Sequence, residues 1–340
     1  MPKRVYITGV TPSAARSPKR RTDYCDLPEV LFKSLGDAGY EVKWGAPLGA
    51  LEFKPDFVFA GFIDPRSMVA NEIYDLAYVL LKLYDFDPAG WCLYLPDWRI
   101  HQFLRGVSYC YRRPSYVEHP THPMRERRRM ASPDGHFPMQ LLLEKWWNNY
   151  WPVVTASAFD WGEDDVMMKN EHGIRFSKLH RVDATSYFPH IVADSITAER
   201  YRAWSYAVLW NYDAWMEKQA FSWRVDHLGA TPYTRLPEKK LLEEMQTRWG
   251  ILSPPYDFKG AGLSRPRYKY AADLGSVLYT QKGELPSPSY NTPLDEIESM
   301  STLQLQMLAH QQAADLKQWQ LTQHEVQRRY SAIVEGQVTT

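Results

Sequence analysis

The segment "DFVFAGFIDPRSMVANEIYDLAYVLLKLYDFDPAGWCLYL", residues 56–95, gives the clearest indication of the fold class. It begins with an apolar run at 56–62, continues with a helical repeat of apolar residues at 70–84, and ends with a second apolar run at 90–95. Short apolar runs are typical of strands buried on both faces, and a helix between two of them connects a parallel pair. The segment therefore predicts a βαβ unit in a parallel sheet that helices cover on both faces.

The same alternation extends in both directions from this segment. Further strands are predicted at 4–10, 40–45, 152–159, 203–209, 223–229, 250–255 and 275–280, and further helices at 27–40, 137–151, 212–220, 236–248 and 265–274. This order is typical of α/β proteins with doubly wound parallel sheets. It predicts two Rossmann-like domains that face a central cleft.

The boundaries follow from changes in composition along the chain. We expect an N-terminal domain at 1–175, with a basic, Pro-rich insertion at about 104–136, and a C-terminal domain at 176–292. The crossing between the halves is expected around 176–192. Residues 294–334 contain neither Gly nor Pro and are rich in Gln, which predicts a long C-terminal helix at 293–335.

The overall composition narrows the class of protein. The chain has 340 residues, 44% of them hydrophobic, with 40 basic and 40 acidic residues, so a polyanionic partner has to be met by a local basic patch. Three cysteines form no disulfide framework and no metal-ligand spacing, which favours a reduced, intracellular setting. No apolar stretch reaches the roughly 18 residues that span a membrane, and the N-terminus has no signal-peptide pattern.

The first candidate catalytic group is Asp97. In "WCLYLPDWRIHQF" (91–103) the apolar run stops at Pro96, and a carboxylate, an indole and a guanidinium follow at once. Ligands of parallel α/β sheets bind at the carboxyl ends of the strands, where Gly9 and Gly61 are also expected. A carboxylate placed there can accept a proton from an attacking hydroxyl. The alternatives are a helix N-cap or an ion-pair partner of Arg99.

Basic runs on two predicted loops are candidates for contact with nucleic acid. The residues are Arg20 and Arg21 in "RSPKRR", and Arg112, Arg113, Arg127, Arg128 and Arg129 in the insertion. Arginines in a groove neutralise phosphates and give a salt-dependent affinity for DNA. The alternative is an ordinary solvated surface, and two such runs in a neutral chain favour nucleic acid.

The segment "KGAGLSRPRYKYAADLGSVLY" (259–279) is a candidate phosphate site. Lys259, Gly260 and Gly262 precede a predicted helix, whose free amides and dipole attract phosphate. Arg265 and Arg267 in the first turn oppose the dipole, and a bound diphosphate explains why they are tolerated. As an isolated motif the segment is weak, because it is neither a Walker loop nor GxGxxG.

We expect no metal site. The spacing of His101, His119, His122 and His136 fits no zinc pattern. The acidic run "DWGEDD" (160–165) has the composition of a divalent-cation site, but an acidic helix start is the more common explanation.

Three local matches give the chain a resemblance to the GT-B glycosyltransferases, most closely to the phage DNA β-glucosyltransferases that modify 5-hydroxymethyl pyrimidines. They are "DFVFAGF…LYLPDWR", which resembles a strand, helix and strand ending in a catalytic Asp, "VDATSYFPH", which resembles the interdomain crossing, and "GLSRPRYKYAADLGSVLY", which resembles the nucleotide-binding segment. In that segment the family's Arg corresponds to Arg267, and its Glu corresponds to Tyr270. The segment after the first strand of the second domain reads "VLWNYDAW", which offers Asn211.

The resemblance implies an inverting transfer of a sugar, most readily glucose from UDP-glucose, to a hydroxymethylated base, most readily 5-hydroxymethylcytosine. It implies Asp97 as the base. The residues expected to contact the donor are Gly9, Asn211, Lys259, Gly260, Gly262, Arg265, Arg267 and Tyr270. The residues expected to contact DNA are Trp98, Arg99, His101 and those of the basic runs. A metal is compatible with this chemistry but not required. We expect a monomer that acts on double-stranded DNA in the cytoplasm of a phage-infected bacterium, without a membrane partner.

Two alternatives stay open at the level of sequence. One is a GT-B transferase that acts on a cell-surface glycan or a small molecule, and it is distinguished by where the basic insertion lies relative to the cleft. The other is a non-catalytic DNA-binding protein of the same fold, which would not bind nucleotide sugars.

Overall fold

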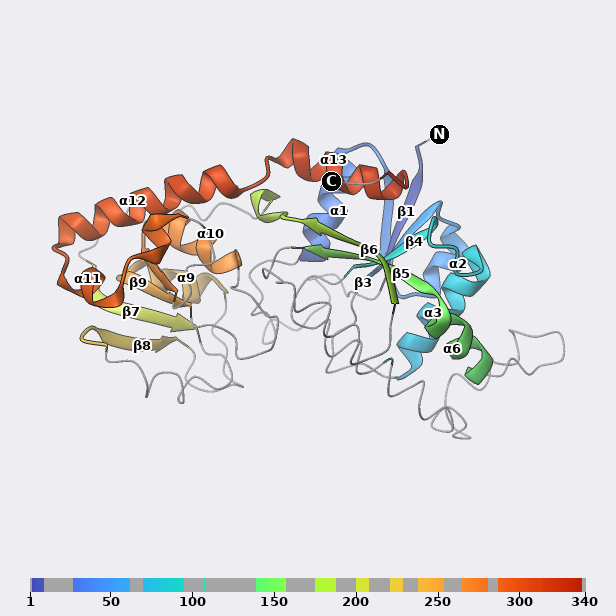
Figure 1. Ribbon diagram of the computed structural model, residues 1–340, viewed down its shortest axis with the longest axis horizontal. Helices are drawn as coiled ribbons and strands as arrows, with labels where there is room; N and C mark the ends of the chain where they lie inside the picture. The colour runs from blue at the N-terminus through green and yellow to red at the C-terminus, as the bar shows by residue number, and fades with distance from the viewer. Residues whose placement is uncertain are drawn as a thin grey trace.

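The computed structural model describes residues 2–8, 27–61, 70–94, 107, 139–156, 175–187, 200–207, 221–228, 238–253, 265–280 and 287–337. These residues form two parallel β-sheets with helices packed against them. Figure 1 shows an elongated molecule in which the two sheets lie at opposite ends, and the C-terminal helices run from one end to the other. The prediction of an α/β protein with two doubly wound sheets is confirmed.

The first sheet is built from the N-terminal half of the chain. Its elements are β1 (Arg4–Thr8), α1 (Leu27–Asp37), β2 (Glu41–Gly45), α2 (Gly49–Phe53), β3 (Phe57–Gly61), α3 (Ala70–Tyr84), β4 (Trp91–Tyr94), α6 (Met139–Asn148), β5 (Tyr150–Ala156) and β6 (Arg175–Val182). Within the described residues the six strands are parallel in the order β2-β1-β3-β4-β5-β6. The order reverses between β1 and β3, so this is the switch point of the first sheet.

Apolar residues bury the central strands of this sheet on both faces. All four residues of β4 are buried, and so are the central residues of β1 and β3. They share one core with α1, α3 and α6, and with a helix from the far C-terminal part of the chain, α13 (Gln323–Val334). Such burial accounts for the nearly continuous apolar runs that predicted the strands.

The second sheet has fewer strands and the same doubly wound character. Its elements are β7 (Tyr201–Ala207), β8 (Arg224–Leu228), α9 (Glu238–Gln246), β9 (Arg248–Ser253), α10 (Arg265–Leu274) and β10 (Val277–Thr280). Among the described residues the order is β10-β9-β7-β8, with every pair parallel. The switch point therefore lies between β7 and β9.

Three helices follow the second sheet, where the sequence predicted one. They are α11 (Leu294–Ser299), α12 (Thr302–Trp319) and α13. A short 3-10 helix, η5 (Pro288–Asn291), leads into α11, and another, η4 (Thr185–Tyr187), follows β6. Helices α12 and α13 each begin with a capping box, formed by Ser301 with Gln304 and by Thr322 with Glu325. Each box provides hydrogen-bond partners for backbone amides that are free at the start of a helix. The predicted long C-terminal helix is confirmed by α12, and the structure divides the rest of 294–334 into the shorter helices α11 and α13.

A glutamine fastens α12 to the second sheet. Gln312 accepts a hydrogen bond from the Leu278 amide at 2.8 Å and donates one to the Leu278 carbonyl oxygen at 2.9 Å. Leu278 lies in β10, the edge strand, so the glutamine takes the place of a further strand. Beside it, Asp315 of α12 accepts hydrogen bonds from Ser287 and Ser289, which hold the pKa of this carboxyl below its usual value.

Other sequence predictions differ from the structure or lie outside it. The predicted crossing at 176–192 contains β6, which pairs with β5 and extends the first sheet to Val182. A polar edge strand of this kind lacks the apolar run that marked the others. The predicted helix at 212–220 and, apart from Val107, the insertion at 104–136 lie outside the described residues.

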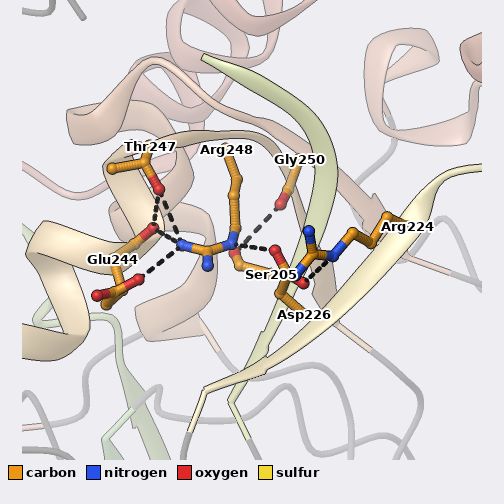
Figure 2. A network of polar contacts seen from close by, with 7 residues as sticks. All are labelled: Ser205, Arg224, Asp226, Glu244, Thr247, Arg248 and Gly250. Atoms are coloured by element: carbon orange, nitrogen blue, oxygen red, sulfur yellow. Dashed lines mark hydrogen bonds and ion pairs between the residues drawn. The ribbon is translucent and has the colours of Figure 1, made fainter. Parts of the chain in front are cut away.

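Arg248, at the start of β9, joins three elements of the second sheet (Figure 2). Its Nε donates to Asp226 of β8 at 2.8 Å, and its Nη1 contacts the side chain of Glu244 in α9 at 3.2 Å. The Arg248 side chain is 11% exposed and that of Asp226 is 15% exposed. Arg224 also pairs with Asp226, at 2.7 Å, but its side chain is 80% exposed. The two arginines thus share one carboxylate in different environments.

Replacing Arg248 with Met should destabilise the second sheet by about 3 kcal/mol, because it leaves a largely buried carboxylate without its buried partner. Arg224→Met is the matched control and should cost at most about 1 kcal/mol, as expected of an exposed ion pair. Denaturant unfolding followed by tryptophan fluorescence measures both. Equal losses in the two variants would contradict the assignment of the stabilisation to the buried pair.

Candidate functional site

The switch points of the two sheets are where this topology places ligands. In doubly wound sheets, ligands bind outside the carboxyl ends of the strands where the strand order reverses. In the first sheet this place is beside Thr8, at the end of β1, and Gly61, at the end of β3. In the second sheet it is beside the ends of β7 and β9, at Ala207 and Ser253. The structure describes more of the surroundings of the second place than of the first.

Arg267 of α10 reaches this edge of the second sheet. It is 7% exposed, and its Nη1 donates to the carbonyl oxygen of Leu252 in β9 at 3.1 Å. Its guanidinium carbon lies 5.7 Å from the centre of the Tyr206 ring in β7. One arginine therefore contacts both strands that flank the switch point.

The route of the Arg267 side chain follows from the two faces of the sheet. Helix α10 packs on the face that carries Ile251 and Leu278, whereas Tyr206 and Leu252 belong to the core on the opposite face. The guanidinium therefore crosses the carboxyl edge of the sheet to reach Tyr206. A cation in this position faces the region where the topology places a ligand.

The C-terminal end of α10 fixes the position of the whole helix. Gly275 has a φ of 59°, and the amide of Ser276 donates to the Ala271 carbonyl at 2.9 Å, as in a Schellman motif. Arg200 donates to the carbonyl of Gly275 at 2.8 Å and to that of Leu274. Burial lowers the pKa of this guanidinium, and its charge complements the negative end of the helix dipole. Arg267 is thereby held on a helix that cannot easily shift.

Tyr270 lies in the hydrophobic core that α10 shares with α12. It is 7% exposed and packs in the cluster that includes Tyr268, Leu278 and Leu316. At the position where the resemblance would have a Glu, this chain thus buries a phenol. Arg265 is the first residue of α10, with Pro266 at the next position, where proline is well tolerated.

The sequence did not identify two groups that contact Arg267, the ring of Tyr206 and the carbonyl of Leu252. It also did not single out Ser253, which is fully buried at the end of β9, one residue after Leu252. Thr8 is likewise fully buried at the end of β1. A small hydroxyl residue at the end of an apolar strand, as in "GILS" (250–253), was the signal available in the sequence.

Most of the other predicted site residues lie outside the described part of the chain. This holds for Asp97, Gly9, Asn211, Lys259, Gly260 and Gly262, and for the DNA-contact candidates Arg20, Arg21, Trp98, Arg99, His101, Arg112, Arg113, Arg127, Arg128 and Arg129. The structure does describe β4, whose last residue is Tyr94, three positions before Asp97. The roles of these residues stay predictions.

Two negative findings concern the described residues alone. They contain no cluster of three or more His, Cys, Asp or Glu side chains that could hold a metal ion, and the histidines at 101, 119, 122 and 136 are not among them. No helix in the described ranges combines the length and the apolar character needed to cross a membrane. Burial raises the pKa of the Cys92 thiol in β4 well above its usual value, which keeps it in its unreactive form.

Sequence comparison identifies no relative: no protein-family model matches the chain, and no curated protein is significantly similar to it. Structure comparison does find similar folds. The DNA-modifying enzyme β-glucosyltransferase, solved with and without uridine diphosphoglucose, has a TM-score of 0.57 at 9% identity, over 98% of this chain and 99% of that chain. T4 phage BGT in complex with UDP-glucose has a TM-score of 0.58 at 10% identity, with the same coverage. The predicted resemblance is confirmed, and the chain has the GT-B fold.

Proposed function

We propose that this protein is an inverting glycosyltransferase that moves a sugar from a UDP-sugar, UDP-glucose first among the candidates, to a 5-hydroxymethyl pyrimidine in DNA, with 5-hydroxymethylcytosine the expected base. The observation that carries the proposal is Arg267, which lies across the carboxyl edge of the second sheet at its switch point. It is supported by similarity, over nearly the whole chain, to an enzyme described as DNA-modifying and solved with UDP-glucose.

The division of labour between the halves is part of the proposal. The N-terminal domain, 1–175, would hold the acceptor DNA, and the C-terminal domain, 176–292, would hold the nucleotide sugar, with 293–335 joining them. Arg267 and Arg265 would stabilise the leaving diphosphate by charge and hydrogen bonds, so that the protein itself meets the charge that develops in the transition state. Gly9, Asn211, Lys259, Gly260, Gly262 and Tyr270 stay candidates for contact with the donor.

Asp97 would act as the general base in the acceptor half. Its carboxylate would take the proton of the hydroxymethyl group while that oxygen attacks the anomeric carbon and the bond to UDP breaks. Trp98, Arg99, His101 and the basic runs would hold the DNA. The target base has to leave the stack, because a base inside the duplex cannot reach a site between two domains. The protein would do this as a monomer in the cytoplasm of the infected host.

One experiment tests the proposal as a whole. The protein is incubated with several UDP-sugars and with DNA that is either hydroxymethylated or plain, and the DNA is then digested to nucleosides for mass spectrometry. A hexose on hydroxymethylated nucleosides alone is the expected result. Binding of UDP-sugar without transfer to DNA would favour a glycan or small-molecule acceptor, and binding of DNA without UDP-sugar would favour a non-catalytic protein.

Arg267→Ala should weaken the binding of UDP by about 1.5–3 kcal/mol, the scale of a hydrogen bond to a charged group. Arg200→Ala is the matched control. Arg200 is a buried arginine outside α10 whose guanidinium donates to the carbonyl of Gly275, at the C-terminal end of that helix. Its replacement should lower stability but leave UDP affinity unchanged. Calorimetry at a temperature where both variants are folded gives the two affinities. Equal weakening would show that Arg267 acts only through the packing of the helix.

Asp97→Ala should abolish transfer and leave UDP affinity nearly intact, because the base is not expected to touch the nucleotide. General base catalysis contributes about 100- to 10,000-fold, so the loss will be measurable in the nucleoside assay. A variant that turns over like the wild type would remove Asp97 from the mechanism.

Changing Arg112, Arg113, Arg127, Arg128 and Arg129 to Ala should weaken DNA binding for all sequences alike. The log–log salt slope should fall by about 0.9 for each phosphate contact removed from duplex DNA. UDP affinity serves as the internal control and should stay the same. A salt slope equal to that of the wild type would identify these arginines as ordinary solvated surface.

A further inference from the structure

The hydroxyl of Ser253 is fully buried and has no visible structural role. Ser253 is 0% exposed, and its Oγ has no hydrogen-bond partner within the described part of the chain. A buried hydroxyl without a partner costs free energy relative to its hydrated state, so native proteins keep few of them. Its retention at the end of β9 calls for a physical reason.

The place of this hydroxyl in the sheet supplies the reason. Side chains alternate between the faces of a strand, so Ser253 lies on the same face as Ile251, which packs against α10. Leu252, the residue between them, accepts the hydrogen bond of Arg267. The hydroxyl therefore lies on the α10 side of the carboxyl edge, beside the strand end to which Arg267 is bonded.

The groups that the topology places at this edge suit an anion. Arg267 brings a positive charge, and the first turn of α10 brings the positive end of a helix dipole. Pro266 has no amide proton to give, so this first turn offers one amide fewer than most. A serine hydroxyl on the neighbouring strand end supplies a further donor in a place closed to water.

We propose that the Ser253 hydroxyl donates a hydrogen bond to the diphosphate of the nucleotide sugar. The inference rests on the proposed function and adds to it a residue that binds the donor. It assigns Ser253 to the diphosphate rather than to uracil or ribose, because a guanidinium and a helix N-terminus favour the anionic part of the ligand. The diphosphate would then satisfy a hydroxyl that has no hydrogen-bond partner among the described residues.

A second serine of the same sheet is a close structural match. Ser205 in β7 is also 0% exposed, but its Oγ donates to the carbonyl oxygen of Gly250 at 3.1 Å (Figure 2). It lies two residues before the end of its strand, and Tyr206, its neighbour, belongs to the opposite face. Ser205 and Ser253 thus share residue type, burial and sheet face, and differ in whether the protein itself satisfies the hydroxyl.

The experiment compares Ser253→Ala with Ser205→Ala. Ser253→Ala should leave the nucleotide-free thermal midpoint unchanged or raise it, because it removes an unpaired buried polar group. It should weaken UDP binding roughly 10- to 100-fold, as expected for a lost hydrogen bond to a charged group, and leave uridine binding unchanged. Ser205→Ala should do the opposite: it should lower the midpoint by about 2–4 °C and leave UDP affinity as it is. Calorimetry with UDP and ligand-observed NMR with uridine give the affinities.

Three outcomes would overturn the inference. They are an unchanged UDP affinity in Ser253→Ala, an equal loss of UDP and uridine affinity, and a midpoint that falls as far as in Ser205→Ala. If the wild type binds UDP and one of these results follows, Ser253 is wrongly assigned while the proposed function stands. If the wild type binds UDP but transfers no sugar to DNA, the acceptor in the proposed function is wrong, and the comparison of the two serines still decides the role of Ser253. A wild type that does not bind UDP would overturn both.

Discussion

The hydrogen bonds between Gln312 and Leu278 fix the arrangement of the C-terminal part of the molecule. An edge strand has unpaired amides and carbonyls, and here the Gln312 side chain of α12 satisfies both the amide and the carbonyl of Leu278 in β10. Because α12 is fastened in this way, the turn at Gln320 and Thr322 directs α13 onto the first sheet. Gln323 then donates to the carbonyl of Ser186, and Glu335 pairs with Lys3. The relation between the two sheets thus depends on two consecutive helices, α12 packed on the second sheet and α13 packed on the first.

The position of Arg267 depends on the same fastening. Helix α10 packs against both the second sheet and α12, and the rings of Tyr268 in α10 and Tyr290 lie 4.9 Å apart between centres. Tyr290 in turn donates to the carbonyl of Gln312 at 2.7 Å. The nucleotide-binding half proposed here is therefore rigid where charge has to be placed. Such preorganised cations and donors stabilise developing charge better than groups that must first reorient.

The periodicity of apolar residues predicted the helices α3 and α10 well, but it did not predict the edge strand β6 or the division of the C-terminal helical segment. The bounds of α3 and α10 agree with the predicted helices at 70–84 and 265–274, because both have apolar residues at helical spacing and clear ends. Strand β6 was missed because "RFSKLHRV" mixes charged and apolar residues and so lacks the apolar run that marked the other strands. The division of the C-terminal helix was readable in the pairs Ser301 with Gln304 and Thr322 with Glu325. In the candidate site, the segment 259–279 identified Arg267. Its contact with Tyr206 depends on how β7 pairs with β9, and strands so far apart in the sequence leave no local pattern that predicts their register.

The packing of α13 on the first sheet has a consequence for how the protein is made. Val326, Tyr330, Ile333 and Val334 complete a core whose other members come from the first 187 residues of the chain. A ribosome therefore delivers the first sheet long before the helix that closes its core. Until the last turn of α13 emerges, the nascent N-terminal half exposes an apolar face that mature protein never shows. Its final folding accordingly waits for the synthesis of α13, and in the cell this interval is the one in which chaperones have a surface to bind.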